Sequence, residues 1–384
     1  MELRLSQRCN QVAQSEIRNM TLECTRVNGV NLAQGVCDLK TPDVVIDAAN
    51  AAMRAGVNTY TRYDGLAALR QAIANKQKRF VGQDLDPERE IIVSAGVTGA
   101  FYAACLALFD AGDEVIIFEP YYGYHVVTLA SLGVTPVFVR LEGADWRVAP
   151  LALEAAVTPR TRAIVVNTPA NPCGKVFSRE ESLLVADFAQ AHNLFVLTDE
   201  IYEHFIYDGL EHVALATLPG MAERTIAISG VSKSFSITGW RIGYALCAPR
   251  WAQTIGYYND LVYVCAPAPL QMGVAAGLNE LGADYYAGIT AAFTAKRERF
   301  CNALAASGLT PHVPRGAYYV LADLSRLDGA DSKARAMDLL RRTGIACVPG
   351  KAFYRDDAGD TLGRFSFAKE DAVIEDVCKR LEGL

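Results

Sequence analysis

The sequence has 384 residues, of which 51% are hydrophobic and 21% are charged, and its formal net charge is −6 at pH 7. This composition is typical of a globular protein with a large core, and the length predicts roughly two to three domains. A mildly acidic chain lacks the positive charge that follows a phosphate backbone, which excludes nucleic acid as a main partner.

The N-terminal stretch and the cysteines indicate the compartment. The first residues, MELRLSQRCNQ, lack the apolar run of a signal peptide, and no stretch of about 18 apolar residues predicts a membrane-spanning helix. The cysteines stand singly, without a CxxC pair or zinc spacing, at Cys9, Cys24, Cys37, Cys105, Cys173, Cys247, Cys265, Cys301, Cys347 and Cys378. We therefore expect reduced thiols, no metal site and a cytoplasmic location.

Short apolar runs alternate with helical patterns along most of the chain. Strands are predicted at 90–96, 113–120, 135–141, 163–169, 194–202, 225–230 and 242–248, with helices near 97–110 and 178–192. Because these runs are apolar on both faces, they predict an α/β fold with a mostly parallel sheet covered by helices. The later pattern, with helices at 289–308 and 332–343 and strands between and after them, predicts a smaller α+β unit without an intervening linker.

Polar and aromatic residues follow the predicted strands, where ligands of parallel sheets bind. They are Thr98, Tyr121, Tyr122, Asn171, Asp199, Tyr202 and Lys233. Taken singly, each also fits a structural role, such as a helix cap for Thr98 or a turn for Asn171. Together they suit a planar cationic ring with a phosphate and an aldehyde, which is the chemistry of pyridoxal 5'-phosphate.

Motifs along nearly the whole chain then point to one family. They are GVCDLKTP (35–42), NTYTRYDGLAALRQAI (58–73), NTPANPCGKV (167–176), TDEIYE (198–203), SKSFSITGWRIGY (232–244), PRGAYY (314–319), VPGKAF (348–353) and GRFSFA (363–368). In this order they resemble class I/II aminotransferases, the fold-type I pyridoxal-phosphate enzymes of the aspartate and aromatic aminotransferase kind. Cys37 and Cys173 depart from the pattern, where proline and threonine are usual.

The resemblance implies a role for each matching residue. Lys233 would carry the cofactor as a Schiff base and then act as general base and acid, with Asp199 on the ring nitrogen. Tyr122 would stack on the ring, and Asn171 and Tyr202 would donate to its oxygen. The phosphate would be held by Val97, Thr98, Ser232 and Arg241, and by Tyr60 of a neighbouring subunit in a homodimer. Arg364 and the backbone of Gly35, with Asn171, would bind the substrate.

The same resemblance implies the architecture and the reaction. We expect a seven-stranded central sheet in a large cofactor-binding domain at 46–284, a small domain at 285–384, and an N-terminal segment, 1–45, that joins the small domain. The expected reaction is a ping-pong transfer of the amino group of an L-amino acid to a 2-oxo acid.

The substrate and several alternatives stay open. A dicarboxylate donor such as aspartate would need a second cation, for which Arg62 and Lys351 are candidates, whereas Tyr63, Tyr124 and Tyr263 would suit an aromatic or neutral donor. A lyase, a cyclising synthase or an oxidase could use the same fold. A ligand sensor would need a further N-terminal domain, for which we expect no room. A dinucleotide oxidoreductase would need the glycine fingerprint GxGxxG, which the sequence lacks.

Overall fold

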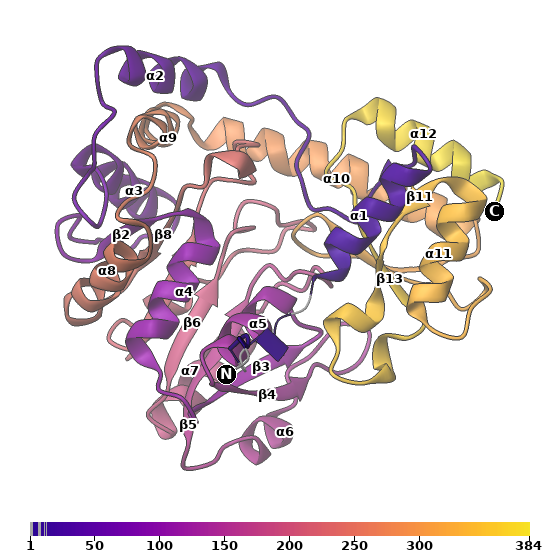
Figure 1. The fold of residues 1–384 in the computed structure, drawn as a ribbon, viewed down its shortest axis with the longest axis horizontal. Helices are drawn as coiled ribbons and strands as arrows, with labels where there is room; N and C mark the ends of the chain where they lie inside the picture. The colour runs from indigo at the N-terminus through magenta and orange to yellow at the C-terminus, as the bar shows by residue number, and fades with distance from the viewer. Residues whose placement is uncertain (1–2, 7–8, 11, 13) are drawn as a thin grey trace.

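Seven strands form the centre of the computed structural model (Figure 1), which describes residues 3–6, 9–10, 12 and 14–384. The strands are β2 (Ile91–Ser94), β3 (Glu114–Glu119), β4 (Thr135–Arg140), β5 (Thr161–Asn167), β6 (Phe195–Asp199), β7 (Thr225–Ser229) and β8 (Gly243–Leu246). They lie in the order β2-β8-β7-β6-β5-β3-β4; β8 is antiparallel to both neighbours, and the pairs from β7 to β4 are parallel. This confirms the predicted mostly parallel, seven-stranded sheet.

Helices cover both faces of this sheet. They are α3 (Ala67–Phe80), α4 (Gly96–Leu108), α5 (Gly123–Ser131), α6 (Pro150–Ala155), α7 (Arg179–Ala191), α8 (Pro249–Tyr263) and α9 (Ala268–Glu280), and α2 (Asp43–Arg54) packs on the outside of α9. In β3, Val115 and Ile117 pack with α4, α5 and α8, whereas Ile116 and Phe118 pack with α6 and α7. Since successive strand side chains point to opposite faces, a sheet covered on both sides needs the continuous apolar runs seen in the sequence.

The chain beyond α9 builds a smaller sheet of its own. Its helices are α10 (Ala283–Ala306), α11 (Ser332–Thr343) and α12 (Asp371–Glu382), and its strands, in the order β12-β13-β10-β9, are Val348–Pro349, Leu362–Ser366, Tyr319–Asp323 and Thr310–His312. The helix α1 (Glu16–Arg26) lies beside this part (Figure 1), and β1 (Val30–Asn31) pairs in parallel with β11 (Ile345–Ala346). The N-terminal segment thus packs against the C-terminal part, while the domain boundaries 1–45, 46–284 and 285–384 stay predictions.

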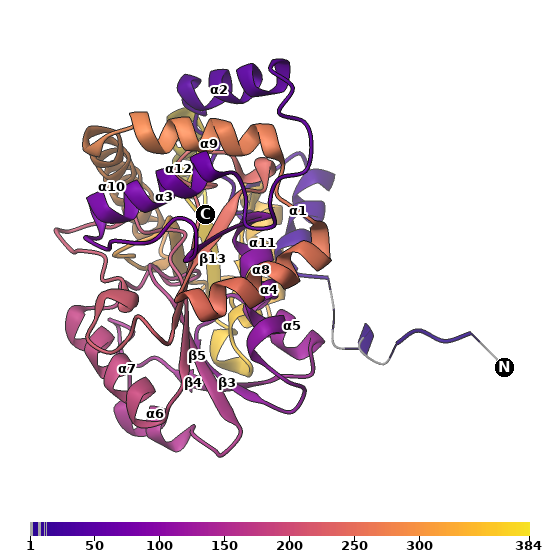
Figure 2. The same cartoon turned by 90° about the vertical axis from the view of Figure 1, so that its left-hand side faces the viewer.

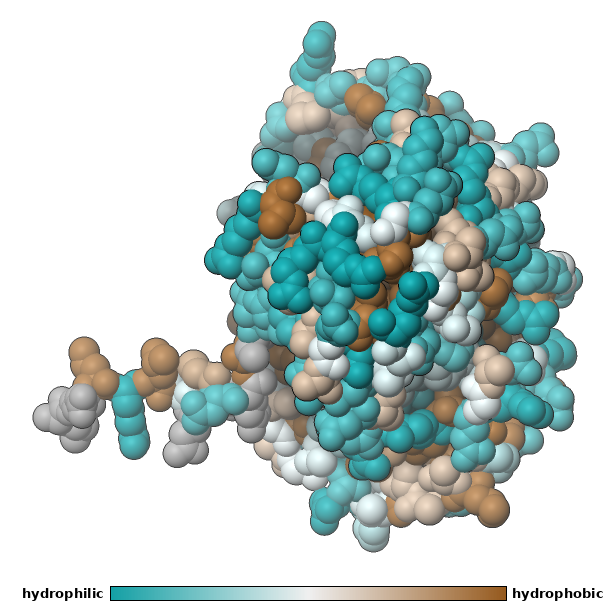
Figure 3. All heavy atoms as spheres, turned by 90° about the vertical axis from the view of Figure 1, so that its right-hand side faces the viewer, coloured by the Kyte–Doolittle hydropathy of each residue, from teal (hydrophilic) through white to brown (hydrophobic). Residues whose placement is uncertain are grey.

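The described residues ahead of α1 extend away from the body of the molecule (Figure 2). Figure 3 shows this arm standing clear of a face on which hydrophilic side chains predominate. The side chains of Leu3 and Leu5 in the arm are 100% and 82% exposed, so they add nothing to the cores. Among the described residues, no helix combines the length and apolarity needed to cross a membrane.

A buried ionic network supports the carboxyl end of β6. The Lys76 ammonium on α3 lies 2.5 Å from Glu203 Oε2, and Ser229 at the end of β7 donates to Glu203 Oε1 over 2.7 Å. Glu200 accepts a hydrogen bond from Thr198 over 2.7 Å. The network therefore fixes the residues on either side of Asp199, the last residue of β6.

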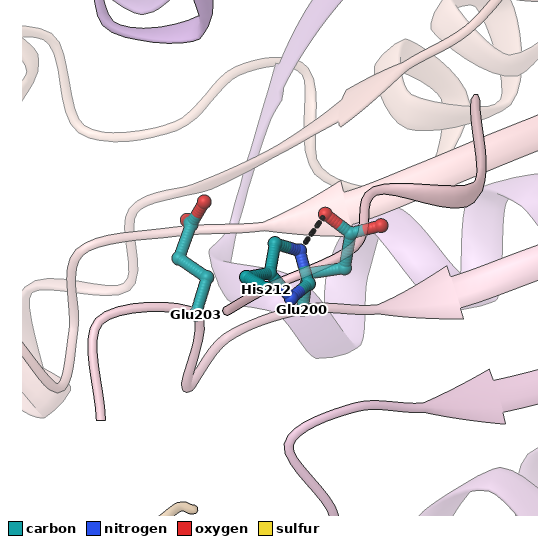
Figure 4. Close-up of side chains that lie close together, drawn as sticks. All are labelled: Glu200, Glu203 and His212. Carbon is teal, nitrogen blue, oxygen red and sulfur yellow. Dashed lines mark hydrogen bonds and ion pairs between the residues drawn. The ribbon is translucent and has the colours of Figure 1, made fainter. Parts of the chain in front are cut away.

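Glu200 also pairs with His212, and these two residues lie close to Glu203 (Figure 4). His212 Nε2 lies 2.9 Å from Glu200 Oε2, and single ligand atoms of the three residues lie within 4.8 Å of one another. That spacing could suit a metal ion, but the Lys76 ammonium already neutralises Glu203. Burial opposes ionisation of Glu203, yet Lys76 and the neighbouring His204 and His212 outweigh it and lower the pKa of Glu203 to about 2. The arrangement is that of a structural network in which Lys76 and His212 pair with the two carboxylates, although the buried His212 Nδ1 has no hydrogen-bond partner among the described residues.

The network predicts a large stability loss when its cation is removed. Lys76→Met leaves Glu203 charged and buried without its partner, which typically costs about 3–5 kcal/mol of unfolding free energy. We expect a markedly lower thermal midpoint at pH 7 by calorimetry, with partial recovery in Lys76→Met/Glu203→Gln. Because the folded-state pKa of Glu203 is about 2 against an ordinary 4.5, the pair's stabilisation is complete above pH 4.5 and is lost as pH falls through about 2.

The matched control is Lys78→Met, which removes an exposed lysine two residues further along α3. Equal midpoints for the Lys76 and Lys78 variants at pH 7 would contradict the assignment of a stabilising role to the buried pair.

Candidate active site

A cavity of about 550 Å³ lies at the carboxyl ends of the parallel strands. Asn167 ends β5, Asp199 ends β6, and Lys233 lies in the turn after β7. Strand register places Asn167 opposite Asp199, and Asp199 opposite Ile228. This edge of a parallel sheet is where ligands of α/β proteins bind, and the volume suits a small-molecule ligand.

The structure brings together in this cavity all but one of the residues to which the resemblance assigns a role; Tyr121, which the sequence also places after a strand, lies outside the lining and packs against Phe138. Those that line it are Gly35, Val97, Thr98, Tyr122, Asn171, Asp199, Tyr202, Ser232, Lys233, Arg241 and Arg364. The exception is Tyr60, whose side chain is 83% exposed and lies outside the cavity lining.

Lys233 faces the segment that links α1 to α2. Its ammonium Nζ donates to the carbonyl oxygen of Gly35 over 3.2 Å and lies 5.9 Å from the ring centre of Tyr202. The hydroxyl of Tyr318 donates to the same Gly35 oxygen, also over 3.2 Å. A carbonyl and an aromatic face hold the amine in place without neutralising it, so the amine remains available for chemistry.

Asp199 is buried and has a histidine partner. Its Oδ2 lies 3.1 Å from His125 Nε2, and its Oδ1 accepts from the backbone N–H of Ile201 over 3.3 Å. His125 comes from the first turn of α5, and its ring lies edge-on to Tyr122, 5.3 Å away. The imidazole and the Ile201 N–H together orient the carboxylate.

The hydroxyls of Tyr202 and Tyr319 form a buried pair, 2.8 Å apart. Burial, followed by the neighbouring hydroxyls of Tyr319 and Tyr318, raises the pKa of Tyr202 well above its ordinary value. Burial likewise raises the pKa of Tyr122. Both phenols therefore stay protonated at neutral pH and can donate hydrogen bonds.

Arg364 on β13 presents a buried guanidinium to the cavity. The side chain is 0% exposed; Nη1 donates to Asn171 Oδ1 over 2.8 Å, and Nη2 donates to the carbonyl oxygen of Ala33. Within the described residues it has no carboxylate partner, and its Nε has no hydrogen-bond partner. Because an unpaired buried charge is costly, this cation favours an anionic ligand.

A second group of donors that would suit an anion lies at the start of α4. Gly96 begins the helix with φ +75°, and a Cβ at this position would meet Arg241 Nη2 at 2.4 Å, so the guanidinium lies directly against the backbone. The residue before the helix, Ala95, provides no side-chain cap. The first-turn N–H groups at Val97 and Thr98 and the positive end of the helix dipole thus join Arg241 beside the cavity.

Several candidates for substrate choice lie outside the cavity. Arg62 is engaged by Asp64 at 2.6 Å and Glu88 at 2.8 Å, and Lys351 lies 3.4 Å from Asp357. Tyr63 packs against Tyr257, and Tyr263 donates to Asn259 and accepts from the Ala95 N–H. Of the three tyrosines expected near the substrate, Tyr124 lines the cavity, stacked on Tyr122.

Three polar residues at the site, His125, Tyr319 and Arg18, are among those that the sequence did not predict. Tyr319 stands inside the motif PRGAYY, and His125 ends the stretch PYYGYH (120–125), which directly follows a predicted strand, so their positions could have drawn attention to them. Arg18 on α1 also lines the cavity, and no motif marks it.

Comparison with known proteins identifies the family. Residues 27–381 match the family model of aminotransferase class I and II. The chain belongs to the class I and II aminotransferases.

Individual relatives agree with this assignment. A probable N-succinyldiaminopimelate aminotransferase of Mycobacterium tuberculosis is 37% identical over 95% of this chain and 94% of its own. The solved structure of that species' N-succinyldiaminopimelate aminotransferase has a TM-score of 0.95 at 36% identity, covering 99% of both chains. Human kynurenine–oxoglutarate transaminase 1 is 33% identical over 92% of this chain and 91% of its own.

The aminotransferase is a pyridoxal-phosphate-dependent enzyme, and its cavity fits that cofactor. The uncapped start of α4 with Arg241 suits a phosphate, Asp199 suits a protonated ring nitrogen, and Lys233 suits an aldehyde. The expected cofactor and the expected class of enzyme are both confirmed.

The contact between Gly35 and Tyr319 generates a prediction. A Cβ at Gly35 would lie 1.9 Å from Tyr319 Oη, and that ring is buried and paired with Tyr202. We expect Gly35→Ala to cost about 1–3 kcal/mol of stability through overpacking and to lower kcat/KM, because the Gly35 carbonyl that contacts Lys233 must shift. Thermal unfolding and steady-state kinetics measure both effects.

Gly282→Ala is the control, since no atom lies within 4 Å of a Cβ built at that position. A Gly35→Ala enzyme as stable and as active as Gly282→Ala would show that the contact relaxes without cost.

Proposed function

We propose that this cavity is the active site of the aminotransferase and that its residues act in the roles that the motifs imply. The observation that carries the proposal is the buried Arg364 guanidinium, which lacks a carboxylate partner among the described residues and lines the same cavity as the Lys233 amine. An amino acid offers its carboxylate to the Arg364 guanidinium and its α-carbon proton to the Lys233 amine.

Bound pyridoxal phosphate supplies an aldehyde that condenses with amines and a ring that accepts the electron pair of the broken Cα–H bond. Val97, Thr98, Ser232 and Arg241 bind its phosphate, and Asp199 keeps its ring nitrogen protonated. Tyr122 offers an aromatic face to the ring. Asn171 and the protonated Tyr202 donate hydrogen bonds to its phenolic oxygen.

The substrate is positioned by Arg364, Asn171 and the backbone of Gly35. The planar guanidinium binds the α-carboxylate through two N–H donors, and this fixes which face of the substrate meets Lys233. The neutral Lys233 amine removes the Cα proton and later returns a proton as general acid.

The half-reaction with a single amino acid tests these roles. We expect Lys233→Ala to lose about 10²- to 10⁴-fold or more in rate, since general acid–base catalysis contributes that much and the residue also anchors the cofactor. Visible absorbance of the bound cofactor, recorded before and after adding an amino acid and then a 2-oxo acid, gives the readout.

Lys40→Ala, which removes an exposed lysine, is the control and should behave as the parent enzyme. Comparable half-reaction rates for the Lys233 and Lys40 variants would refute the role of Lys233. Release of ammonia without recovery on adding a 2-oxo acid would instead favour a lyase or an oxidase.

Names of relatives support two kinds of donor. The mycobacterial relative is named for an N-acylated diamino dicarboxylic acid, and the human one for an aromatic amino acid. YbdL from Escherichia coli, whose solved structure has a TM-score of 0.95 at 29% identity over the full length of both chains, is described as having a methionine aminotransferase function. Aspartate or an aromatic or neutral amino acid therefore stays the proposed donor, with a 2-oxo acid as acceptor.

A homodimer with active sites near the interface is also part of the proposal. An apolar patch lies where the 60–63 segment meets the end of α8, and the two are joined by the Tyr63–Tyr257 ring contact. Its exposed members are Tyr60, Tyr257, Leu261, Val262 and Val264. Contiguous exposed apolar side chains favour burial against another protein, and a second copy of this chain would bring Tyr60 to the neighbouring phosphate site.

The dimer predicts a matched pair of variants. Leu261→Asp places a charge in the patch and should shift the protein towards monomer in sedimentation velocity, with loss of activity. Leu151→Asp, at an 86% exposed leucine on α6, should leave the sedimentation coefficient unchanged. Equal coefficients for the two variants and the parent protein would refute this interface.

The cytoplasm is the proposed location, supported by the free thiols of the ten cysteines.

A further inference from the structure

Two buried phenol hydroxyls meet where the two parts of the chain face each other. Tyr202 follows β6 of the larger sheet, and Tyr319 is the first residue of β10 in the smaller sheet. Their hydroxyl oxygens lie 2.8 Å apart, and the two residues are 3% and 2% exposed. Both line the active-site cavity. The hydrogen bond therefore joins a residue proposed to contact the cofactor to a residue for which the motifs implied no role.

Strand register and packing fix the position of Tyr319. In the pairing of β10 with β13, Leu321 lies opposite Arg364, and Tyr319 stands two residues before Leu321 on the same face. Tyr319 and Arg364 are thus diagonal neighbours, within reach of long side chains, and the guanidinium carbon lies 4.4 Å from the centre of the Tyr319 ring. A Cβ at Gly35 would clash with the Tyr319 hydroxyl, so the backbone of Gly35 closes against it. These contacts hold the hydroxyl beside Tyr202.

The direction of the hydrogen bond follows from the acceptors at hand. Without the cofactor, either hydroxyl can donate. In the proposed function Tyr202 donates its one proton to the ring oxygen of the cofactor, so the lone pairs of its own oxygen are left to accept. Among the described residues, Tyr202 is the one hydrogen-bond partner of the Tyr319 hydroxyl. Because a buried hydroxyl without a partner is costly, Tyr319 must then donate to Tyr202.

The neighbouring charge makes Tyr319 a strong donor. A cation over an aromatic face favours negative charge on the phenol oxygen, and it therefore makes the Tyr319 O–H more polar. Hydrogen bonds in a chain polarise one another, so a stronger donor to Tyr202 makes Tyr202 a stronger donor in turn. The adjacent hydroxyl of Tyr318 cannot take this place, since it donates to the Gly35 carbonyl oxygen over 3.2 Å.

We propose that Tyr319 is a positioning residue that acts through Tyr202: its hydroxyl donates to Tyr202 Oη and directs the Tyr202 proton at the ring oxygen of pyridoxal phosphate. The inference rests on the proposed function, because it assumes that Tyr202 contacts this oxygen. Its consequence is electrostatic. A strong hydrogen bond stabilises the negative charge of the ring oxygen, so this oxygen holds the proton on the nearby nitrogen that links Lys233 to the cofactor less tightly.

The test is a pH titration of the visible absorbance of the bound cofactor without substrate. Its midpoint reports the proton on the Lys233 linkage and requires no turnover. Tyr319→Phe keeps the ring beside Arg364 and removes the hydroxyl, and we expect the midpoint to rise by about 0.4 to 1 pH unit, the equivalent of one hydrogen bond. The other charged side chains of the described cavity lining stay in place in this variant; they are Arg18, Asp199, Arg241 and Arg364.

A double-mutant cycle separates action through Tyr202 from direct action on the cofactor. Tyr202→Phe should raise the midpoint more than Tyr319→Phe, because it removes the hydrogen bond to the ring oxygen itself. Adding Tyr319→Phe to Tyr202→Phe should then cause no further rise.

Tyr207→Phe is the matched control. It removes a hydroxyl that is buried in the same core, donates to the Ala317 carbonyl oxygen and lies outside the cavity lining. This variant should lower the thermal unfolding temperature, as Tyr319→Phe does, and keep the titration midpoint of the parent enzyme.

Two results would overturn the inference alone. One is a Tyr319→Phe titration midpoint that matches the midpoint of the parent enzyme or of Tyr207→Phe. The other is a Tyr319→Phe shift that is as large in the Tyr202→Phe background as in the parent. An unchanged midpoint in Tyr202→Phe would instead refute the proposed contact between Tyr202 and the ring oxygen, on which the inference rests.

Discussion

Parallel strands end on one edge of their sheet, and the candidate active site depends on this constraint. The register that pairs Asn167 with Asp199, and Asp199 with Ile228, places the segments after β5, β6 and β7 side by side. Residues far apart in sequence thereby meet in one cavity. The Lys76–Glu203 pair and the Glu200–His212 pair then fix the backbone just beyond Asp199, where a small displacement would misplace the carboxylate.

The second wall of the cavity comes from the other end of the chain. Arg364 on β13 and Gly35 after β1 belong to the part built from both termini, and they contact Asn171 and Lys233 of the larger sheet. In the proposed roles, the groups for the phosphate and the ring lie in one part, and two of the three groups for the substrate carboxylate, Arg364 and Gly35, lie in the other. Any change in how the two parts pack would alter the distance between Lys233 and Arg364, and with it the fit of an amino acid.

Charge supports the proposal that the cavity binds anions. Without a bound anion, the fully buried guanidinium of Arg364 and the helix start at Gly96, which has no side-chain cap, are both energetically unfavourable. Both become favourable when a carboxylate and a phosphate bind.

The sequence by itself determined the strand positions, the parallel sheet and the identity of most site residues. Apolar runs report burial on both faces, and local motifs such as SKSFSITGWRIGY and GRFSFA keep their reactive residues at fixed spacing. Only the tertiary structure decided which of the candidate cations already have carboxylate partners. Arg62 and Lys351 looked available in the sequence, but carboxylates from other segments bind them, and Arg18 and His125 reach the site through helix packing that no local pattern encodes. The physical reason is that a side chain's partners are set by contacts between distant segments, which exist only after the chain has folded.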